Sequence, residues 1–248
     1  MHRPQNPPAA GLHVASNPHC RIGENPLWHP THRKLYWCDI PFGRLYAFDP
    51  ETRTTELLHD GTHDGTLLGG FTIQHDGALL LFMDHGRIDR WTPASSQTLV
   101  PPHPSHAGMR FNDVIADPVG RVFCGTMSLS EPLDASPGNL YRLDHDATLT
   151  PILTNVLCSN GLAFTRNARH LFHTDSLRRT ITRFDYDLAT GTLSRPVRTS
   201  RTASPTASPS TPKTTSGPRT GAATASSATL PTAASKVASL YPPAESPA

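Results

Sequence analysis

The chain has 248 residues, enough for one large domain or two small ones, and a formal net charge of only +2. So small a charge gives no indication of a nucleic-acid or membrane-surface partner, and we expect neither. The N-terminus lacks the apolar core of a signal peptide, and no segment has the roughly 20 apolar residues of a membrane-spanning helix. We therefore expect a cytoplasmic protein.

The four cysteines, Cys20, Cys38, Cys124 and Cys158, are far apart and form no CxxC pair. Such spacing predicts reduced thiols in a cytosolic protein. One disulfide, or secretion by a leader not visible here, is the alternative.

Four stretches share one pattern: a polar turn, a short apolar strand, a second turn, and a strand ending in an aromatic residue or Leu and usually Asp. In chain order the first strands are expected at 35–37, 79–81, 122–123 and 171–172, and the second at 46–49, 88–91, 141–144 and 181–185. The spacing of roughly 45 residues is typical of four-stranded propeller blades. No long helical stripe is present. We predict an all-β fold of the six-bladed β-propeller type, with a β-sandwich as the alternative.

Six blades at this period need about 270 residues, whereas four are recognisable here. From residue 199 onward the chain is rich in Ser, Thr, Ala and Pro and poor in residues that build a core. This composition favours disorder. We therefore expect an N-terminal segment at residues 1–19, about four blades at 20–198, and a low-complexity, disordered tail at 199–248.

Several polar residues precede or end strands expected to face a central channel. Glu24 lies in "RIGENPLWHP", Arg110 and Asn112 in "MRFNDVIADP", Asn160 in "LCSNGLAF" and Asp175 in "LFHTDSL". Each alone reads more simply as a turn or surface residue. Together, at one phase of the repeat, their carboxylate and amide oxygens suit a hard divalent cation.

The segments "GENPLWHPTHRKLYWCDI", "RFNDVIADPVGRVFCGTM", "SNGLAF" and "FDYDLATG" resemble the regucalcin (senescence marker protein) and gluconolactonase family of sugar lactonases, over residues 23–198. The resemblance implies a propeller that binds one divalent cation, Ca²⁺ or Zn²⁺ with Mn²⁺ or Mg²⁺ as further candidates, and hydrolyses a small-molecule sugar lactone. It implies that Glu24 and Asn160 are metal ligands and that Arg110 and Asn112 contact the substrate.

The sequence also departs from the family. The family's third metal ligand and base is the Asp of a Pro-Asp-Gly motif in the blade after "FDYDLATG", and this sequence has no such motif. The family's further substrate Glu falls at Ser130, beside Glu131, so no role is carried over and the catalytic residue stays unassigned. Three hypotheses remain: a metal-dependent lactonase impaired by loss of C-terminal blades, a non-catalytic calcium-binding protein, and an inactive truncated or frameshifted product.

Overall fold

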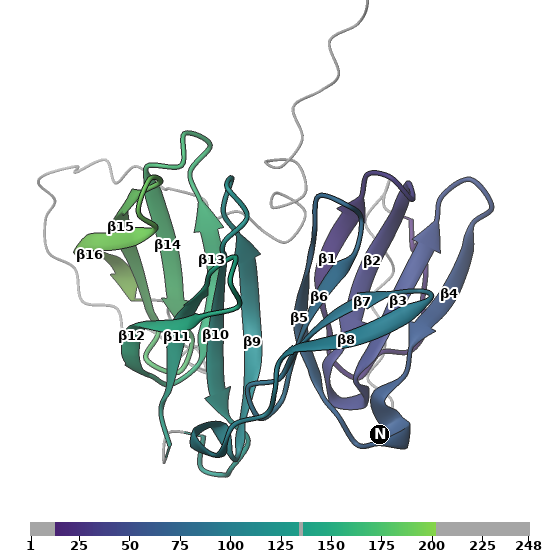
Figure 1. Cartoon of the computed structure of the whole chain (residues 1–248), viewed down its shortest axis with the longest axis horizontal. Helices are drawn as coiled ribbons and strands as arrows, with labels where there is room; N and C mark the ends of the chain where they lie inside the picture. The colour runs from purple at the N-terminus through teal and green to yellow at the C-terminus, as the bar shows by residue number, and fades with distance from the viewer. Residues whose placement is uncertain (1–12, 134–135, 202–248) are drawn as a thin grey trace, which may run out of the picture.

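The computed structural model describes residues 13–133 and 136–201, which form sixteen strands in four antiparallel sheets. Each sheet takes four consecutive strands, and Figure 1 shows the first two sheets of the chain on the right and the last two on the left. Blade 1 contains β1 (Gly23–His29), β2 (Lys34–Asp39), β3 (Arg44–Asp49) and β4 (Thr54–His59), and blade 2 contains β5 (Leu68–Ile73), β6 (Leu79–Met83), β7 (Ile88–Thr92) and β8 (Ser95–Val100). Blade 3 contains β9 (Met109–Ala116), β10 (Val122–Ser128), β11 (Gly138–Leu143) and β12 (Leu149–Val156), and blade 4 contains β13 (Ser159–Phe164), β14 (His170–Asp175), β15 (Thr180–Asp187) and β16 (Thr192–Arg201).

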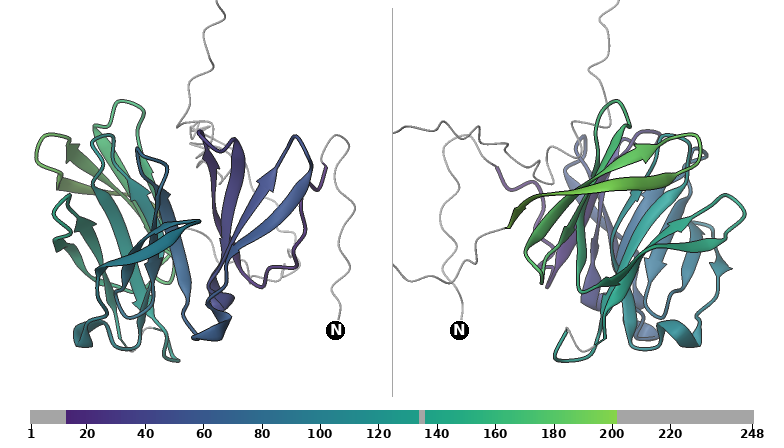
Figure 2. Two further views of the ribbon diagram at one scale, coloured as in Figure 1. Left: turned by 45° about the vertical axis from the view of Figure 1, so that its right-hand side comes forward. Right: turned by 90° about the vertical axis from the view of Figure 1, so that its left-hand side faces the viewer.

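The predicted propeller blades are confirmed. The residues described contain no α-helix, and their only helical segments are three short 3-10 turns. Strands β1, β5, β9 and β13 are the innermost strands, and the left view of Figure 2 places blade 4 on the left side of the molecule and blade 1 on the right. No helix in the described part of the chain is long and apolar enough to cross a membrane. All four cysteines are free, as predicted. The tail expected to be disordered lies, beyond Arg201, outside the described residues.

The blades are held together by apolar faces that repeat with the sequence. The face that each later blade turns to its predecessor is buried at equivalent positions: Phe71, Leu79, Leu81 and Trp91 in blade 2; Val114, Val122, Cys124 and Leu143 in blade 3; Leu162 and Leu171 in blade 4. Alternating residues of a strand point to opposite faces, so each blade has a second apolar face for its other neighbour. This alternation explains the dense apolar runs of β6 and β10.

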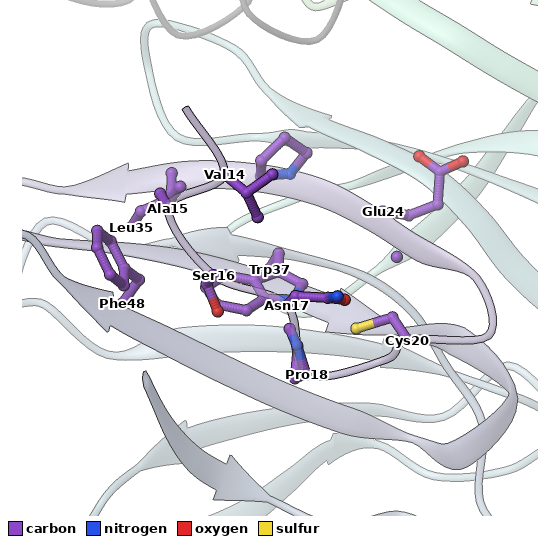
Figure 3. Close-up of a pocket in the computed structure, with 12 residues that line it drawn as sticks. Val14, Ala15, Ser16, Asn17, Pro18, Cys20, Glu24, Leu35, Trp37 and Phe48 are labelled. Atoms are coloured by element: carbon purple, nitrogen blue, oxygen red, sulfur yellow. The ribbon is translucent and has the colours of Figure 1, made fainter. Parts of the chain in front are cut away.

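Blade 1 carries the same apolar face without a described blade against it. Its residues at these positions are Pro26, Leu35, Trp37 and Phe48. They line a pocket of about 440 Å³, over which the segment from Val14 to Cys20 passes (Figure 3). Glu24 lies at the margin of this pocket, apart from the aromatic rings.

The innermost strands approach one another closely. A Cβ on Gly69 of β5 would lie 1.9 Å from the Phe111 carbonyl oxygen of β9. A Cβ on Gly125 of β10 would lie 1.8 Å from Ser159 Oγ of β13. Only glycine fits at these two contacts, and the close approach brings polar residues of different blades to one place.

Candidate functional site

Every innermost strand carries a β-bulge at the same point of the repeat. The pairing with the neighbouring strand gains one extra residue between Glu24 and Leu27, between Leu68 and Gly70, between Phe111 and Val114, and between Asn160 and Ala163. Bulges bend a strand and redirect its side chains. The polar residues singled out in the sequence therefore lie where the strand is no longer regular.

The bulges meet around one small pocket. Its lining residues come from blades 1 to 4, and they are Glu24, Asn25, Ile40, Gly69, Asn112, Asp113 and Asn160. Three of the four residues to which the family resemblance assigns a role, Glu24, Asn112 and Asn160, share this pocket. Blade 2 contributes Gly69 at the equivalent position, so no side chain enters from that blade.

Arg110 fixes the orientation of Asn112. Its Nη1 donates hydrogen bonds to Asn112 Oδ1 at 2.8 Å and to the Phe111 carbonyl at 2.9 Å. Asn112 Nδ2 in turn donates to the Ser159 carbonyl of blade 4 at 2.8 Å. Because a carbonyl only accepts, the amide of Asn112 has a single orientation, and it ties β9 to β13.

Arg110 does not line the pocket but lies within electrostatic range of it. Burial lowers the pKa of the Arg110 guanidinium, and the neighbouring Cys158, Cys38 and Glu24 act in the opposite direction. Arg110 is thus a half-buried cation close enough to Glu24 to interact with its carboxylate electrostatically.

Glu24 of β1 and Asn160 of β13 both line the pocket. The Glu24 side chain is exposed on β1, and its backbone carbonyl lies 3.5 Å from Cys38 Sγ. Asn160 is half-buried; its Oδ1 accepts from the Gly161 backbone at 2.9 Å, and its Nδ2 lies 3.4 Å from Ser176 Oγ. Both residues retain oxygen lone pairs that a cation can share.

Asp113 is a pocket residue that the sequence reasoning missed. Its Oδ2 accepts a 2.6 Å hydrogen bond from the Leu162 backbone N–H of blade 4. Asp113 directly follows Asn112 in the quoted "RFND", so its place in the motif was the available signal. Regular alternation assigns two consecutive residues to opposite faces, and only the bulge brings both to one pocket.

Asp175, grouped with the channel residues in the sequence, does not line this pocket. Its carboxylate accepts hydrogen bonds from the backbone N–H groups of Leu157 (3.0 Å) and Cys158 (3.2 Å) and pairs with Arg178 at 2.7 Å. In blade 1 the Asp39 carboxylate likewise accepts hydrogen bonds from the backbone N–H groups of Arg21 and Ile22. Asp175 therefore fixes the loop leading into the innermost strand.

The donor set fits a hard divalent cation in kind. The pocket offers the Glu24 and Asp113 carboxylates and the Asn112 and Asn160 amides, all oxygen donors. Within the described residues no group of three or more His, Cys, Asp or Glu side chains is placed to hold a metal. The amides would therefore have to share the coordination with the carboxylates.

The model of one protein family, described as the SMP-30/gluconolactonase/LRE-like region, matches residues 22–209, which is most of the chain. The chain belongs to this family. Pentonolactonase XacC of Haloferax volcanii is 46% identical over 178 residues, and human regucalcin is 30% identical over 178 residues. The calcium-binding protein regucalcin from Agrobacterium tumefaciens has the same fold, with a TM-score of 0.66 at 17% identity, over 75% of this chain and 61% of that one.

These alignments cover only part of the relatives. They include 71% of this chain but 57% of the pentonolactonase and 58% of human regucalcin. The chain thus spans somewhat more than half the length of the curated relatives it matches.

Proposed function

We propose that the pocket is the site of a metal-dependent sugar lactonase. Glu24 and Asn160 hold one divalent cation, Ca²⁺ or Zn²⁺ with Mn²⁺ or Mg²⁺ as alternatives, and Arg110 and Asn112 bind the lactone. The observation that carries this proposal is that Glu24, Asn112 and Asn160, from blades 1, 3 and 4, line one pocket. The pentonolactonase name of a 46% identical relative supports a five-carbon aldonolactone as substrate, and the 6-deoxy-6-sulfogluconolactonase name of a 31% identical relative supports a six-carbon one.

The residues of the chain would bind and orient the substrate. Arg110 is a half-buried donor whose Nη1 already positions the Asn112 amide, so both side chains meet an incoming hydroxyl or carbonyl in fixed geometry. Glu24 and Asn160 would hold the cation, which when bound would supply Lewis-acid polarisation of the lactone carbonyl. Hydrolysis adds water across the ring ester bond and releases the open-chain hydroxy acid.

We propose further that the 248-residue chain is a weak lactonase by itself. The Pro-Asp-Gly motif that supplies the family's base is absent from its sequence. The second carboxylate in the pocket, Asp113, is engaged by the Leu162 backbone. Loss of a general base removes about 10²–10⁴-fold in rate.

A non-catalytic calcium-binding protein is the second candidate. It is favoured by the same observation, because oxygen donors suffice to bind Ca²⁺ while hydrolysis also needs a base. For the lactonase candidate, the proposed partner is a small sugar lactone. The cytoplasmic location is proposed from the composition of the chain.

The test is acid release from a pentonolactone and from gluconolactone, above the spontaneous rate, with each of the four cations. We expect slow, metal-dependent turnover that is lost in Glu24→Gln and kept in Glu56→Gln, a change at an exposed carboxylate of β4. Metal binding without turnover would favour the calcium-binding candidate. Equal turnover in Glu24→Gln and the unchanged chain would remove Glu24 from the site.

A further inference from the structure

The position that follows each site residue alternates between an acceptor side chain and glycine. In blades 1 to 4 these residues are Asn25, Gly70, Asp113 and Gly161. Asn25 Oδ1 accepts a 2.6 Å hydrogen bond from the Phe71 backbone N–H, and Asp113 Oδ2 accepts one of 2.6 Å from Leu162. The two bonds are equivalent, since each reaches the residue two places beyond the site position of the next blade.

Leu162 lies inside the bulge of β13. The pairing of β13 with β14 runs from Asn160 opposite Thr174 directly to Ala163 opposite Phe172. Gly161 and Leu162 between them have no paired residue in the ladder, and Gly161 has a φ of +54°. A buried backbone N–H in such a bulge needs an acceptor from elsewhere, and Asp113 supplies it.

This bond fixes the backbone that carries Asn160. The Asn160 side chain leaves the strand at the start of the bulge, and its own Oδ1 bonds to Gly161 N inside the bulge. A change in the path of residues 161–162 therefore changes where the Asn160 amide points. No comparable side chain depends on the bond from Asn25, because blade 2 has Gly69 at the site position.

We propose that Asp113 is a positioning residue that aims Asn160 into the pocket by holding the Leu162 backbone, and that its acceptor oxygen matters more than its charge. Asn25 performs the same structural task in blade 1 with an uncharged amide. The inference rests on the proposed function only in treating Asn160 as a cation ligand; the backbone geometry stands without it.

A general loosening of the interface between blades 3 and 4 has to be separated from this effect. Tyr186 of blade 4 offers the control, because its hydroxyl donates to Asp117 Oδ2 of blade 3 and accepts from Arg121 Nη2 at 3.0 Å. None of these three residues lines the pocket. Tyr186→Phe thus removes a hydrogen bond across the same interface at a distance from Asn160.

The experiment compares the full ¹⁵N-labelled chain with Asp113→Ala, Asp113→Asn and Tyr186→Phe. Two NMR signals report directly: hydrogen exchange of the Leu162 amide, and the side-chain amide pair of Asn160, assigned by its loss in Asn160→Ser. We expect faster Leu162 exchange and shifted Asn160 signals in Asp113→Ala alone. Asp113→Glu, which moves the acceptor by one methylene, should give the same shift if the alanine variant does not fold.

A Ca²⁺ titration of the same samples links the geometry to the site. Asp113→Ala should bind about tenfold more weakly, as expected when a residue supporting a ligand is removed, while Tyr186→Phe binds as the unchanged chain does. The proposal is overturned if Asp113→Asn matches Asp113→Ala in Leu162 amide exchange and in the shift of the Asn160 signals. It is also overturned if the Asn160 signals are unmoved in Asp113→Ala. Absence of Ca²⁺ binding by the unchanged chain contradicts the proposed function, whereas the NMR signals still decide the role of Asp113.

Discussion

Arg110 and Asn112 form one rigid unit: Arg110 Nη1 donates to Asn112 Oδ1 at 2.8 Å, and Asn112 Nδ2 donates to the Ser159 carbonyl at 2.8 Å. The two residues are on the same strand, and the chain of bonds extends into the neighbouring blade. Loss of either partner therefore disturbs both sides of the pocket.

Arg110→Ala should weaken binding of a non-hydrolysable lactone analogue, such as a pentonolactam, by about 10–100-fold. The reason is that a hydrogen bond to a charged group contributes roughly 1.5–3 kcal/mol. Titration calorimetry measures the effect. Arg90→Ala, which removes a surface ion pair with Asp76, is the matched control and should leave binding unchanged. Equal affinity in both variants would exclude Arg110 from substrate binding.

Gly69→Ala should lower the free energy of unfolding by about 1–3 kcal/mol, the usual cost of overpacking. The added Cβ meets the Phe111 carbonyl oxygen at 1.9 Å, and backbone cannot move aside as a flexible side chain can. Urea unfolding measures the change. Gly23→Ala, whose Cβ has its nearest contact at an ordinary 3.4 Å, should be nearly neutral. A neutral Gly69→Ala would mean that blades 2 and 3 are not packed as described.

His173 should make stability fall in acid. Its imidazole is buried beside Ser159 Oγ at 3.0 Å, and burial lowers its pKa to about 4. Because the folded pKa lies below the unfolded value of about 6.5, the neutral form is favoured in the fold, and stability present above pH 6.5 is lost as the pH falls toward 4.

The contribution of His173 over this window is about 3 kcal/mol, from roughly 1.4 kcal/mol for each pKa unit. His173→Gln should therefore show a flatter dependence of unfolding free energy on pH between 6.5 and 4. The exposed His75→Gln should retain the slope of the unchanged chain. An unchanged slope in His173→Gln contradicts the burial of this imidazole.

The thiols should react in an order set by burial. Burial raises the pKa of Cys38 and Cys124, both fully buried, and so keeps them as unreactive thiols. Cys20, which is partly exposed, should be alkylated first in the native chain at pH 8. Peptide mass spectrometry after brief labelling tests the order, and early modification of Cys124 would contradict the core of blades 2 and 3.

The sequence was sufficient to predict the blades, because the 45-residue period and the alternation of apolar residues both follow from strand geometry. The positions 35–37 and 79–81 fall within β2 and β6 as expected. The bulges could not be predicted, since they depend on register between strands. Asp113 was missed for this reason.

Asp175 shows the opposite difficulty. An Asp at the end of a strand has the same sequence signal whether it faces a channel or caps a loop, and only the partners Leu157 and Cys158 distinguish the two. The position of Gly69 in the pocket could not be predicted either, because a glycine at a site position has no side chain that would indicate a function. The assignment of Glu24 and Asn160 as metal ligands stays a prediction.

The most direct measurement is calorimetric titration of Ca²⁺, and then Zn²⁺, into the 248-residue chain and its Glu24→Gln variant. The account predicts one bound cation per chain, with affinity at least about tenfold lower in Glu24→Gln because the pocket loses one of its two carboxylate charges. No binding by the unchanged chain, or identical isotherms for both proteins, would contradict a cation site built on Glu24 and Asn160.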